Sequence, residues 1–159
     1  LTLLVQKPQM TRHEVTACLR QLAEPGQPNL LLAVAGGGLS EGVDYPGDLL
    51  VGAIIVGPAI PGVGPAREAL RDYYQKHYGQ GDDYAYTYPA MAKVIQAAGR
   101  VIRSELDRGV IVLIDGRFVE RRYSDLMPRD WYVDSVRELV STSILSDLRA
   151  FWGGVEATP

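Results

Sequence analysis

Three nearly continuous apolar runs constrain the fold of this chain more than any other feature of its sequence. They cover residues 30–34, 51–56 and 110–114. A strand with water on one face alternates apolar and polar side chains, whereas a strand covered on both faces is apolar throughout. Each run is far shorter than the roughly 20 apolar residues that a membrane span needs. The runs therefore predict strands buried on both faces of a parallel sheet.

Helical patterns fill the intervals between these runs. Thr11 and Glu14 form a capping box that begins one helix. Gly79-Gln80-Gly81 ends the helix expected from Pro65, and Pro89 suits the first turn of another. The expected further elements are a strand at 3–5 and helices at 11–22, 65–77, 89–103 and 132–152. Strands that alternate with helices predict an α/β fold with a mostly parallel sheet flanked by helices. We expect a single domain over residues 1–159.

Length, charge and cysteine content narrow the class of protein. The 159 residues fit one domain, and the formal net charge of −3 argues mildly against a free-standing nucleic-acid binder. Cys18 is the single cysteine, so the chain forms no internal disulfide, and His13 and His77 lack companions at metal-ligand spacing. We expect no metal site, no membrane partner and a cytoplasmic location.

A basic segment occupies residues 96–103, with the sequence Gln-Ala-Ala-Gly-Arg-Val-Ile-Arg. On one continuous helix, Gln96, Arg100 and Arg103 share a face, because residues three and four apart are neighbours. Gly99 beside them lets a ligand approach closely. Two guanidiniums on one face, with no carboxylate in the same turn, predict a clamp for phosphate oxygens.

A glycine-rich loop at residues 36–47 follows the first apolar run directly. Backbone amides exposed in such a turn suit anionic groups, and the carboxylates of Glu41 and Asp44 can accept from hydroxyls or from the arginines. The structural alternative is a loop whose glycines supply positive φ and whose Asp44 caps a short helix. Parallel sheets bind ligands at the carboxyl ends of their strands, so this loop and the loop at 57–64 mark the expected site.

In this order, the two segments resemble motifs V and VI of superfamily 2 helicases, and more narrowly those of the XPD/DinG family. Residues 38–48 are similar to the motif V region, and residues 96–110 are similar to motif VI and the strand after it. Asp115-Gly116-Arg117-Phe118 is similar to the family's usual Asp-Arg-Arg-Phe, from which Gly116 departs. The resemblance covers roughly residues 5–129. It implies the family's second RecA-like motor domain, which is a three-layer sandwich.

The resemblance also implies roles in an ATP-dependent DNA helicase that unwinds 5′-to-3′ and serves DNA repair. Arg100 and Arg103 would face the ATP phosphates across a cleft between two motor domains, one of them as an arginine finger. Gln96 would hold that interface. The residues at the nucleotide would be Gly42, Asp44, Glu41 and Gly99. Ser40 and Glu41 would couple the nucleotide site to single-stranded DNA.

Two parts of the phosphoryl-transfer machinery are missing from the sequence. It has no Gly-x-x-x-x-Gly-Lys-[Ser/Thr] phosphate loop, and no Asp-Glu pair follows an apolar strand to hold Mg²⁺. The resemblance implies that both lie on an N-terminal RecA-like domain of the same polypeptide, usually with an iron–sulfur cluster. We therefore expect this chain to be a fragment of a longer enzyme, whose ATP and Mg²⁺ are bound mainly by that other domain.

The sequence leaves alternatives open. The chain can instead be a stand-alone module that binds a nucleotide or a phosphorylated partner through its arginines without catalysis. The arginine segment also fits a solvated basic face that uses Glu105 and Asp107 as counter-ions. A group of tyrosines fits either stacking on DNA bases or packing between helices and sheet, and we expect packing for most of them. They are Tyr73, Tyr74, Tyr78, Tyr84, Tyr86 and Tyr88.

We predict that the chain by itself folds but hydrolyses no ATP, because phosphoryl transfer needs a phosphate cradle, Mg²⁺ ligands and a charge clamp together. The measurement is a DNA-stimulated ATPase assay on the 159-residue chain and on a version extended at its N-terminus. Robust turnover by the chain alone would contradict the motor-half interpretation. No turnover by the extended version, with single-stranded DNA and Mg²⁺ present, would favour the binding module.

Overall fold

A computed structural model describes residues 1–26, 28–40, 42, 43, 45 and 49–153. Its strands are β1 (Thr2–Val5), β2 (Asn29–Leu32), β3 (Gly52–Val56) and β4 (Val110–Ile114). Its α-helices are α1 (Arg12–Leu22), α2 (Pro65–Tyr78), α3 (Tyr88–Ala98), α4 (Arg121–Ser124) and α5 (Ile144–Gly153). A π-helix, η2 (Asp83–Thr87), precedes α3, and the 3₁₀ helices are η3 (Gly116–Val119), η4 (Arg129–Trp131) and η5 (Val136–Leu139).

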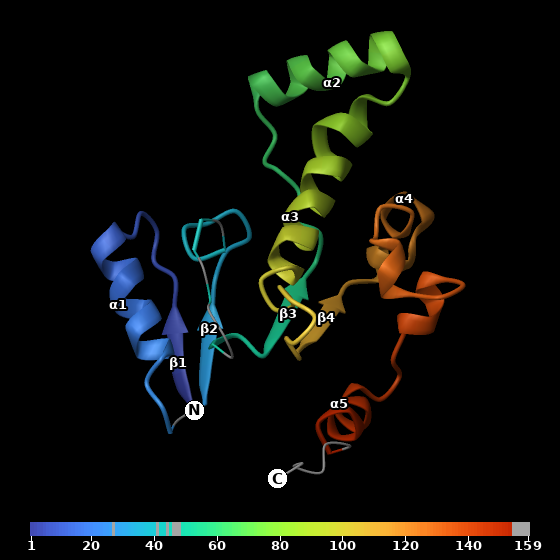
Figure 1. Ribbon diagram of the computed structural model, residues 1–159. Coiled ribbons are helices and arrows are strands. Elements are labelled where there is room, and N and C mark those ends of the chain that lie inside the picture. The colour runs from blue at the N-terminus through green and yellow to red at the C-terminus, as the bar shows by residue number, and fades with distance from the viewer. Residues whose placement is uncertain (27, 41, 44, 46–48, 154–159) are drawn as a thin grey trace.

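The strands pair in parallel, as the sequence predicts. β1 pairs with β2, with Leu3 opposite Leu30, and β3 pairs with β4, with Ala53 opposite Ile111. In Figure 1, α1 returns the chain from β1 to β2, and α2 and α3 carry it from β3 to β4. The part of the chain that the structure describes forms two two-stranded sheets rather than one continuous sheet. The α/β class with parallel strands is confirmed.

The prediction that the strands are buried on both faces is wrong. In β3, Ile54 and Val56 are 63% and 79% exposed, whereas Ile55 between them packs against the core. In β2, Leu30 and Leu32 are exposed and alternate with half-buried Leu31. Successive strand residues point to opposite faces, and α3 packs against β3. An apolar run shows that a strand suits burial, but only the packed neighbours decide which face is covered.

The main core forms where α3 meets β3, β4 and the segments after β4. Its buried members are Met91, Val94, Phe118, Tyr123, Met127 and Val136. Met91, Val94 and Ala98 are three and four residues apart, so α3 presents them on one face. Half-buried Ile55 and Leu113 bring β3 and β4 into the same cluster. Residues after β4 thus complete the core around α3.

Local signals set the ends of two helices as predicted. At α1, the Glu14 amide donates to the Thr11 hydroxyl at 3.3 Å, and the Thr11 amide donates to the Glu14 carboxylate at 2.8 Å. This reciprocal pair is the predicted capping box. At α2, Pro65 occupies the first turn, and Gly79 ends the helix with φ +70°, a left-handed conformation that glycine adopts without strain.

The prediction of one helix over residues 132–152 is wrong. The segment folds into η5 and the shorter α5 instead. Ser135 begins η5 with a capping box, in which the Glu138 carboxylate accepts from the amides of Asp134 and Ser135 at 2.7 and 2.6 Å. The chain is extended again at Val140. Serine and acidic side chains that accept from nearby amides compete with helical hydrogen bonds, so the apolar spacing alone overestimates the helix.

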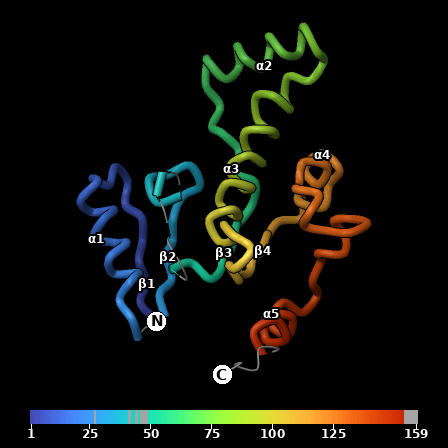
Figure 2. The backbone as a smooth tube through the Cα atoms, viewed as in Figure 1, coloured from blue at the N-terminus to red at the C-terminus, as the bar shows by residue number. Residues whose placement is uncertain are grey.

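The helices α2 and α3, joined by η2, form an arm that projects beyond the strands (Figure 2). Tyr74 of α2 stacks on Tyr84 of η2 with ring centroids 4.1 Å apart and planes within 3°. Arg67 of α2 donates from Nη1 to the Ala85 carbonyl at 3.1 Å. Tyr74 and Tyr84 therefore pack helix against helix within the arm, and not against the sheet as the sequence suggested.

We predict that Gly109→Ala destabilises the chain by about 1–3 kcal/mol, the usual cost of overpacking. A Cβ at Gly109 would lie 2.3 Å from Val101 Cγ1 and 2.9 Å from the Val51 carbonyl oxygen. That oxygen accepts from the Val110 amide at 3.1 Å, so it cannot retreat without disturbing the start of the β3–β4 pair. Gly116→Ala is the control, because a Cβ there meets nothing within 4 Å. Urea unfolding measures the free energy of unfolding of the two variants, and equal values for Gly109→Ala and Gly116→Ala would contradict the prediction.

Candidate functional site

The helix that carries Gln96 ends at Ala98, so the prediction that Gln96, Arg100 and Arg103 share one helical face is wrong. Gly99 is the C-cap, and the Arg100 amide donates to the Ala97 carbonyl at 3.2 Å in a tight last turn. Glycine has a low helix propensity, which favours an end there. Gln96 is exposed on α3, Arg100 is half-buried in the turn, and Arg103 lies in the segment beyond it. The two arginines therefore belong to a turn and not to a helix.

Asp107 fixes the backbone of that segment. Its Oδ2 accepts from the amides of Arg103 and Ser104, both at 2.7 Å. The hydrogen bond from the Arg103 amide is the largest of the effects that lower the pKa of Asp107, and the charge of Arg103 is the smallest. Asp107 therefore acts mainly as a local cap that turns the chain, and only to a lesser degree as the counter-ion that the sequence suggested.

The glycine-rich loop after β2 is held by its own polar atoms and by buried apolar side chains. The Ser40 hydroxyl donates to the carbonyls of Val34 and Gly37 at 2.9 and 3.0 Å. Gly42 has φ +73°, the positive value expected of a glycine in such a loop, and it is exposed. Leu39 and Val43, on either side, are buried. Two predicted site residues, Glu41 and Asp44, lie outside the described residues.

Gln6 contacts the glycine-rich loop, and the sequence reasoning missed this contact. Its side-chain Oε1 accepts from the Val34 backbone amide at 3.2 Å, and the Gln6 backbone amide donates to the Leu32 carbonyl at 2.8 Å. A Cβ on Gly37 would lie 2.2 Å from Gln6 Nε2, so a larger residue there would displace the end of the Gln6 side chain. Gln6 directly follows β1, and parallel pairing with β2 brings it to the start of the loop. No local sequence signal identifies this contact.

The glycine-rich loop and the arginine segment meet at Tyr45, although they lie far apart in the sequence. Arg103 donates from Nη1 to the Tyr45 carbonyl oxygen at 3.0 Å. The Tyr45 side chain is buried, and its hydroxyl donates to the Leu39 carbonyl. Burial, followed by the nearby Cys18, raises the pKa of Tyr45, while the charge of Arg100 lowers it. Both predicted arginines thus lie beside one buried tyrosine that the sequence reasoning did not single out.

Another polar cluster joins the ends of β3 and β4. The Asp115 carboxylate accepts from the Arg117 amide at 2.9 Å and from Arg117 Nε and Nη2 at 2.9 and 2.7 Å. These bonds lower the pKa of Asp115 from 3.8 to about 2, with the Arg117 side chain as the largest cause. Gly57, with φ +77°, lies against this pair, because a Cβ there would approach Arg117 Nη2 to 3.2 Å. Phe118 follows and enters the core.

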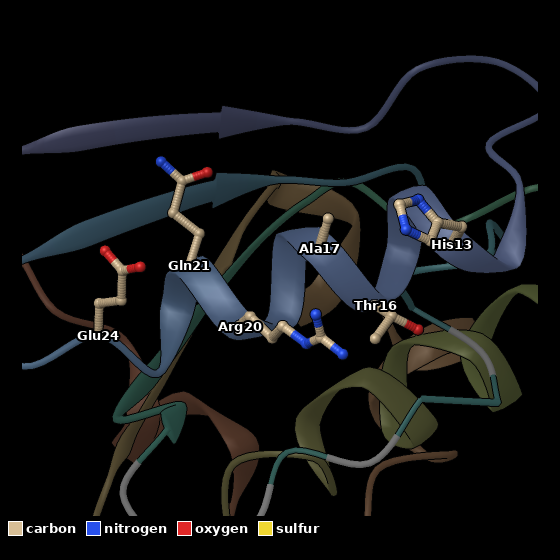
Figure 3. A pocket seen from close by; sticks show the side chains of 6 residues that line it. All are labelled: His13, Thr16, Ala17, Arg20, Gln21 and Glu24. Carbon is tan, nitrogen blue, oxygen red and sulfur yellow. The ribbon is translucent and has the colours of Figure 1, made fainter.

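An open pocket lies elsewhere, along α1 (Figure 3). Its lining side chains are His13, Thr16, Ala17, Arg20, Gln21 and Glu24. None of them belongs to the glycine-rich loop or to the arginine segment, so the pocket and the candidate site are separate. Among the described residues, no three His, Cys, Asp or Glu side chains gather as a metal site. The described helices also include none with the length and apolar character that a membrane crossing requires.

Comparison with known proteins gives consistent matches. Residues 1–133 match the family model described as helicase C-terminal domain. The chain is 38% identical over 116 residues to the ATP-dependent DNA helicase DinG of Photobacterium profundum, covering 71% of this chain and 16% of that protein. It is 34% identical over 146 residues to the XPD helicase subunit of general transcription and DNA repair factor IIH of Schizosaccharomyces pombe, covering 86% and 18%. The chain thus spans less than a fifth of the length of either relative.

Solved structures agree on the fold. A chain of XPD in its apo form superposes with a TM-score of 0.62 at 22% identity, covering 79% of this chain and 26% of that one. A chain of the XPD helicase gives a TM-score of 0.61, also at 22% identity, with 79% and 23% covered. These matches confirm the α/β arrangement expected from the sequence.

We predict that Asp115→Asn destabilises the chain at neutral pH and that this effect fades in acid. The folded-state pKa of about 2 lies below the ordinary 3.8, so the stabilisation is complete above 3.8 and is lost as the pH falls toward 2. Urea unfolding of both proteins at pH 7 and at several acidic pH values measures this. Asp125→Asn is the control, because its partner Arg121 is 92% exposed. A difference that stays constant down to acidic pH would contradict the assignment.

Proposed function

This chain belongs to the helicase C-terminal domain family, and from that membership we propose that it is the second RecA-like motor domain of an ATP-dependent DNA helicase. In this proposal, the chain supplies the glycine-rich loop and the arginine segment to an ATP site shared with an N-terminal RecA-like domain of the same polypeptide. The curated relatives named DinG and XPD are described as an ATP-dependent DNA helicase and as a helicase subunit. Unwinding in the 5′-to-3′ direction is part of the proposal.

The contact between Arg103 and Tyr45 is the observation that carries this proposal. It joins the end of the glycine-rich loop to the arginine segment through a 3.0 Å hydrogen bond. The charge of Arg100 also acts on Tyr45, as the smallest of three effects on its pKa, which supports a role for both arginines at this location. A nucleotide phosphate needs donors and positive charge at one location, and these two segments supply both together.

The guanidinium groups in this part of the proposed site favour a phosphate over a metal ion as their ligand. Guanidiniums bind phosphate oxygens with a planar fork, whereas Mg²⁺ takes carboxylate and phosphate oxygens. We therefore assign the phosphates of ATP to Arg100 and Arg103, and Mg²⁺ to the N-terminal domain. Cys18 is the sole cysteine of the chain, so we also assign any iron–sulfur cluster to that domain.

The remaining predicted residues take supporting roles in the proposal. Gln96, exposed on α3, contacts the facing motor domain. Gly42 and Gly99 are both exposed and let the nucleotide approach the backbone. Glu41 and Asp44 are assigned to the nucleotide side by the motif resemblance alone. Ser40 ties the loop back to Val34, which lets it couple nucleotide contacts to movement along single-stranded DNA.

We predict that Arg100→Ala or Arg103→Ala in the complete helicase lowers DNA-stimulated ATP turnover by about 10³–10⁵-fold while nucleotide binding stays largely intact. An arginine finger acts mainly on charge that develops in the transition state, and its removal costs rate in that range. Lysine at either position should not restore turnover, because it lacks the planar fork. The measurements are steady-state ATPase kinetics and equilibrium binding of a nucleotide analogue.

Arg121→Ala is the matched control, since Arg121 is 92% exposed and pairs only locally with Asp125 in the described part of the chain. It should leave turnover unchanged. Near-normal ATPase in either the Arg100 or the Arg103 variant would refute the clamp. Loss of nucleotide binding without a loss of kcat would instead favour a binding module.

A further inference from the structure

We propose that Tyr45 is a positioning residue, which holds the guanidinium of Arg103 in the orientation that it needs at the nucleotide phosphates. This inference rests on the function proposed above and adds to it a residue that holds the arginine in place. Tyr45 acts through its backbone carbonyl, which accepts from Arg103 Nη1 at 3.0 Å. The side chain of Tyr45 serves to keep that carbonyl in place.

The Tyr45 side chain is well suited to fix its own backbone. Tyr45 is 3% exposed, and two other members of the loop are buried as well, Leu39 at 1% and Val43 at 8%. Its hydroxyl donates to the Leu39 carbonyl, six residues back along the chain. Because this bond is buried, a shift of Tyr45 away from Leu39 would break a buried hydrogen bond.

Arg103 is braced from two independent directions. Its amide donates to Asp107 Oδ2 at 2.7 Å, which fixes the point where the side chain leaves the backbone. Its guanidinium donates to the Tyr45 carbonyl, which fixes where the side chain ends. A free arginine side chain has many rotamers, and ordering them carries a large entropic cost. The hydrogen bond to the Tyr45 carbonyl orders the Arg103 side chain before the nucleotide binds. A donor that is ordered in advance is more effective in catalysis, because it does not have to reorganise during the reaction.

Protonation keeps the tyrosine in its bracing form. Burial raises the pKa of Tyr45, and the nearby Cys18 acts in the same direction, against the smaller opposing effect of Arg100. The phenol therefore stays protonated at neutral pH and remains a donor to the Leu39 carbonyl. Phenylalanine at this position keeps the buried ring but removes that donor, so it separates the hydrogen bond from the packing.

The first test measures ATPase kinetics of Tyr45→Phe and Tyr45→Ala in the complete helicase. We expect Tyr45→Ala to lower kcat about 100-fold, the scale of loss from a misplacement of about 1 Å, with KM for ATP nearly unchanged. We expect Tyr45→Phe to recover much of this loss and to remain about five-fold below the parent, because one buried hydrogen bond is missing. Arg121→Ala is the control again, because Arg121 is 92% exposed and pairs locally with Asp125.

The second test observes Arg103 directly in this chain. Nitrogen-15 NMR of the arginine Nε groups reports how freely each guanidinium moves. Tyr45→Ala should raise the mobility of Arg103, Tyr45→Phe should raise it less, and Arg117 should stay unchanged because Asp115 holds it in both variants. Thermal unfolding of each variant identifies one that fails to fold, and Tyr45→Phe then carries the test.

The outcomes separate the two proposals. Unchanged Arg103 mobility in both folded variants overturns the role of Tyr45, whatever the ATPase shows. Normal kcat in both variants overturns it too, if Arg103→Ala is inactive in the same assay. Normal turnover in Arg103→Ala itself refutes the proposed function, and the NMR result then decides alone whether Tyr45 orients Arg103. A raised KM with unchanged kcat also overturns the positioning role, because it shows a loss of uniform binding.

Discussion

Parallel pairing of β3 with β4 is the constraint on which the rest of this structure depends. Parallel strands cannot be joined by a tight turn, so the chain has to leave the sheet after β3 and return to the same end before β4. The crossover contains α2, η2 and α3. One face of α3 supplies Met91 and Val94 to the core, and the turn after it carries Arg100 and Arg103. The position of the arginines thus follows from the need to bring β4 back beside β3.

Polar side chains that accept from backbone amides shape the segments between these elements. Asp107 turns the chain after α3, Asp115 closes the end of β4, and Glu138 caps η5. In each case, a carboxylate takes amide hydrogen bonds that a longer helix or an irregular loop would otherwise leave unsatisfied. These bonds lower the pKa of Asp107 and Glu138, and the Arg117 side chain, ahead of the Arg117 amide, lowers the pKa of Asp115, so the arrangement holds best with the carboxylates ionised. The same side chains decide where regular structure stops.

The candidate site combines a net acidic chain with a local concentration of positive charge. The formal net charge is −3, yet Arg100 lies in the turn after α3 and Arg103 lies just beyond it. Arginine side chains bind phosphate through short hydrogen bonds as well as through the long-range field of the protein. A local pair of guanidiniums can therefore bind phosphate on a domain whose net charge is negative. A clamp of this kind is incomplete as a catalyst, because it lacks a phosphate cradle and Mg²⁺ ligands. For this reason the proposed function divides the motor between two domains.

The sequence by itself determined the elements whose signals are local. The capping box of Thr11 and Glu14, the proline and glycine at the two ends of α2 and the apolar runs of β2 to β4 predicted the α/β class, and the order of two motifs predicted the family. Tertiary structure decided what depends on distant partners: which face of each strand is covered, and that Tyr45 meets Arg103. The reason is physical. Caps and turns involve neighbours in the chain, whereas burial and the Arg103–Tyr45 bond join residues that only the parallel crossover brings together.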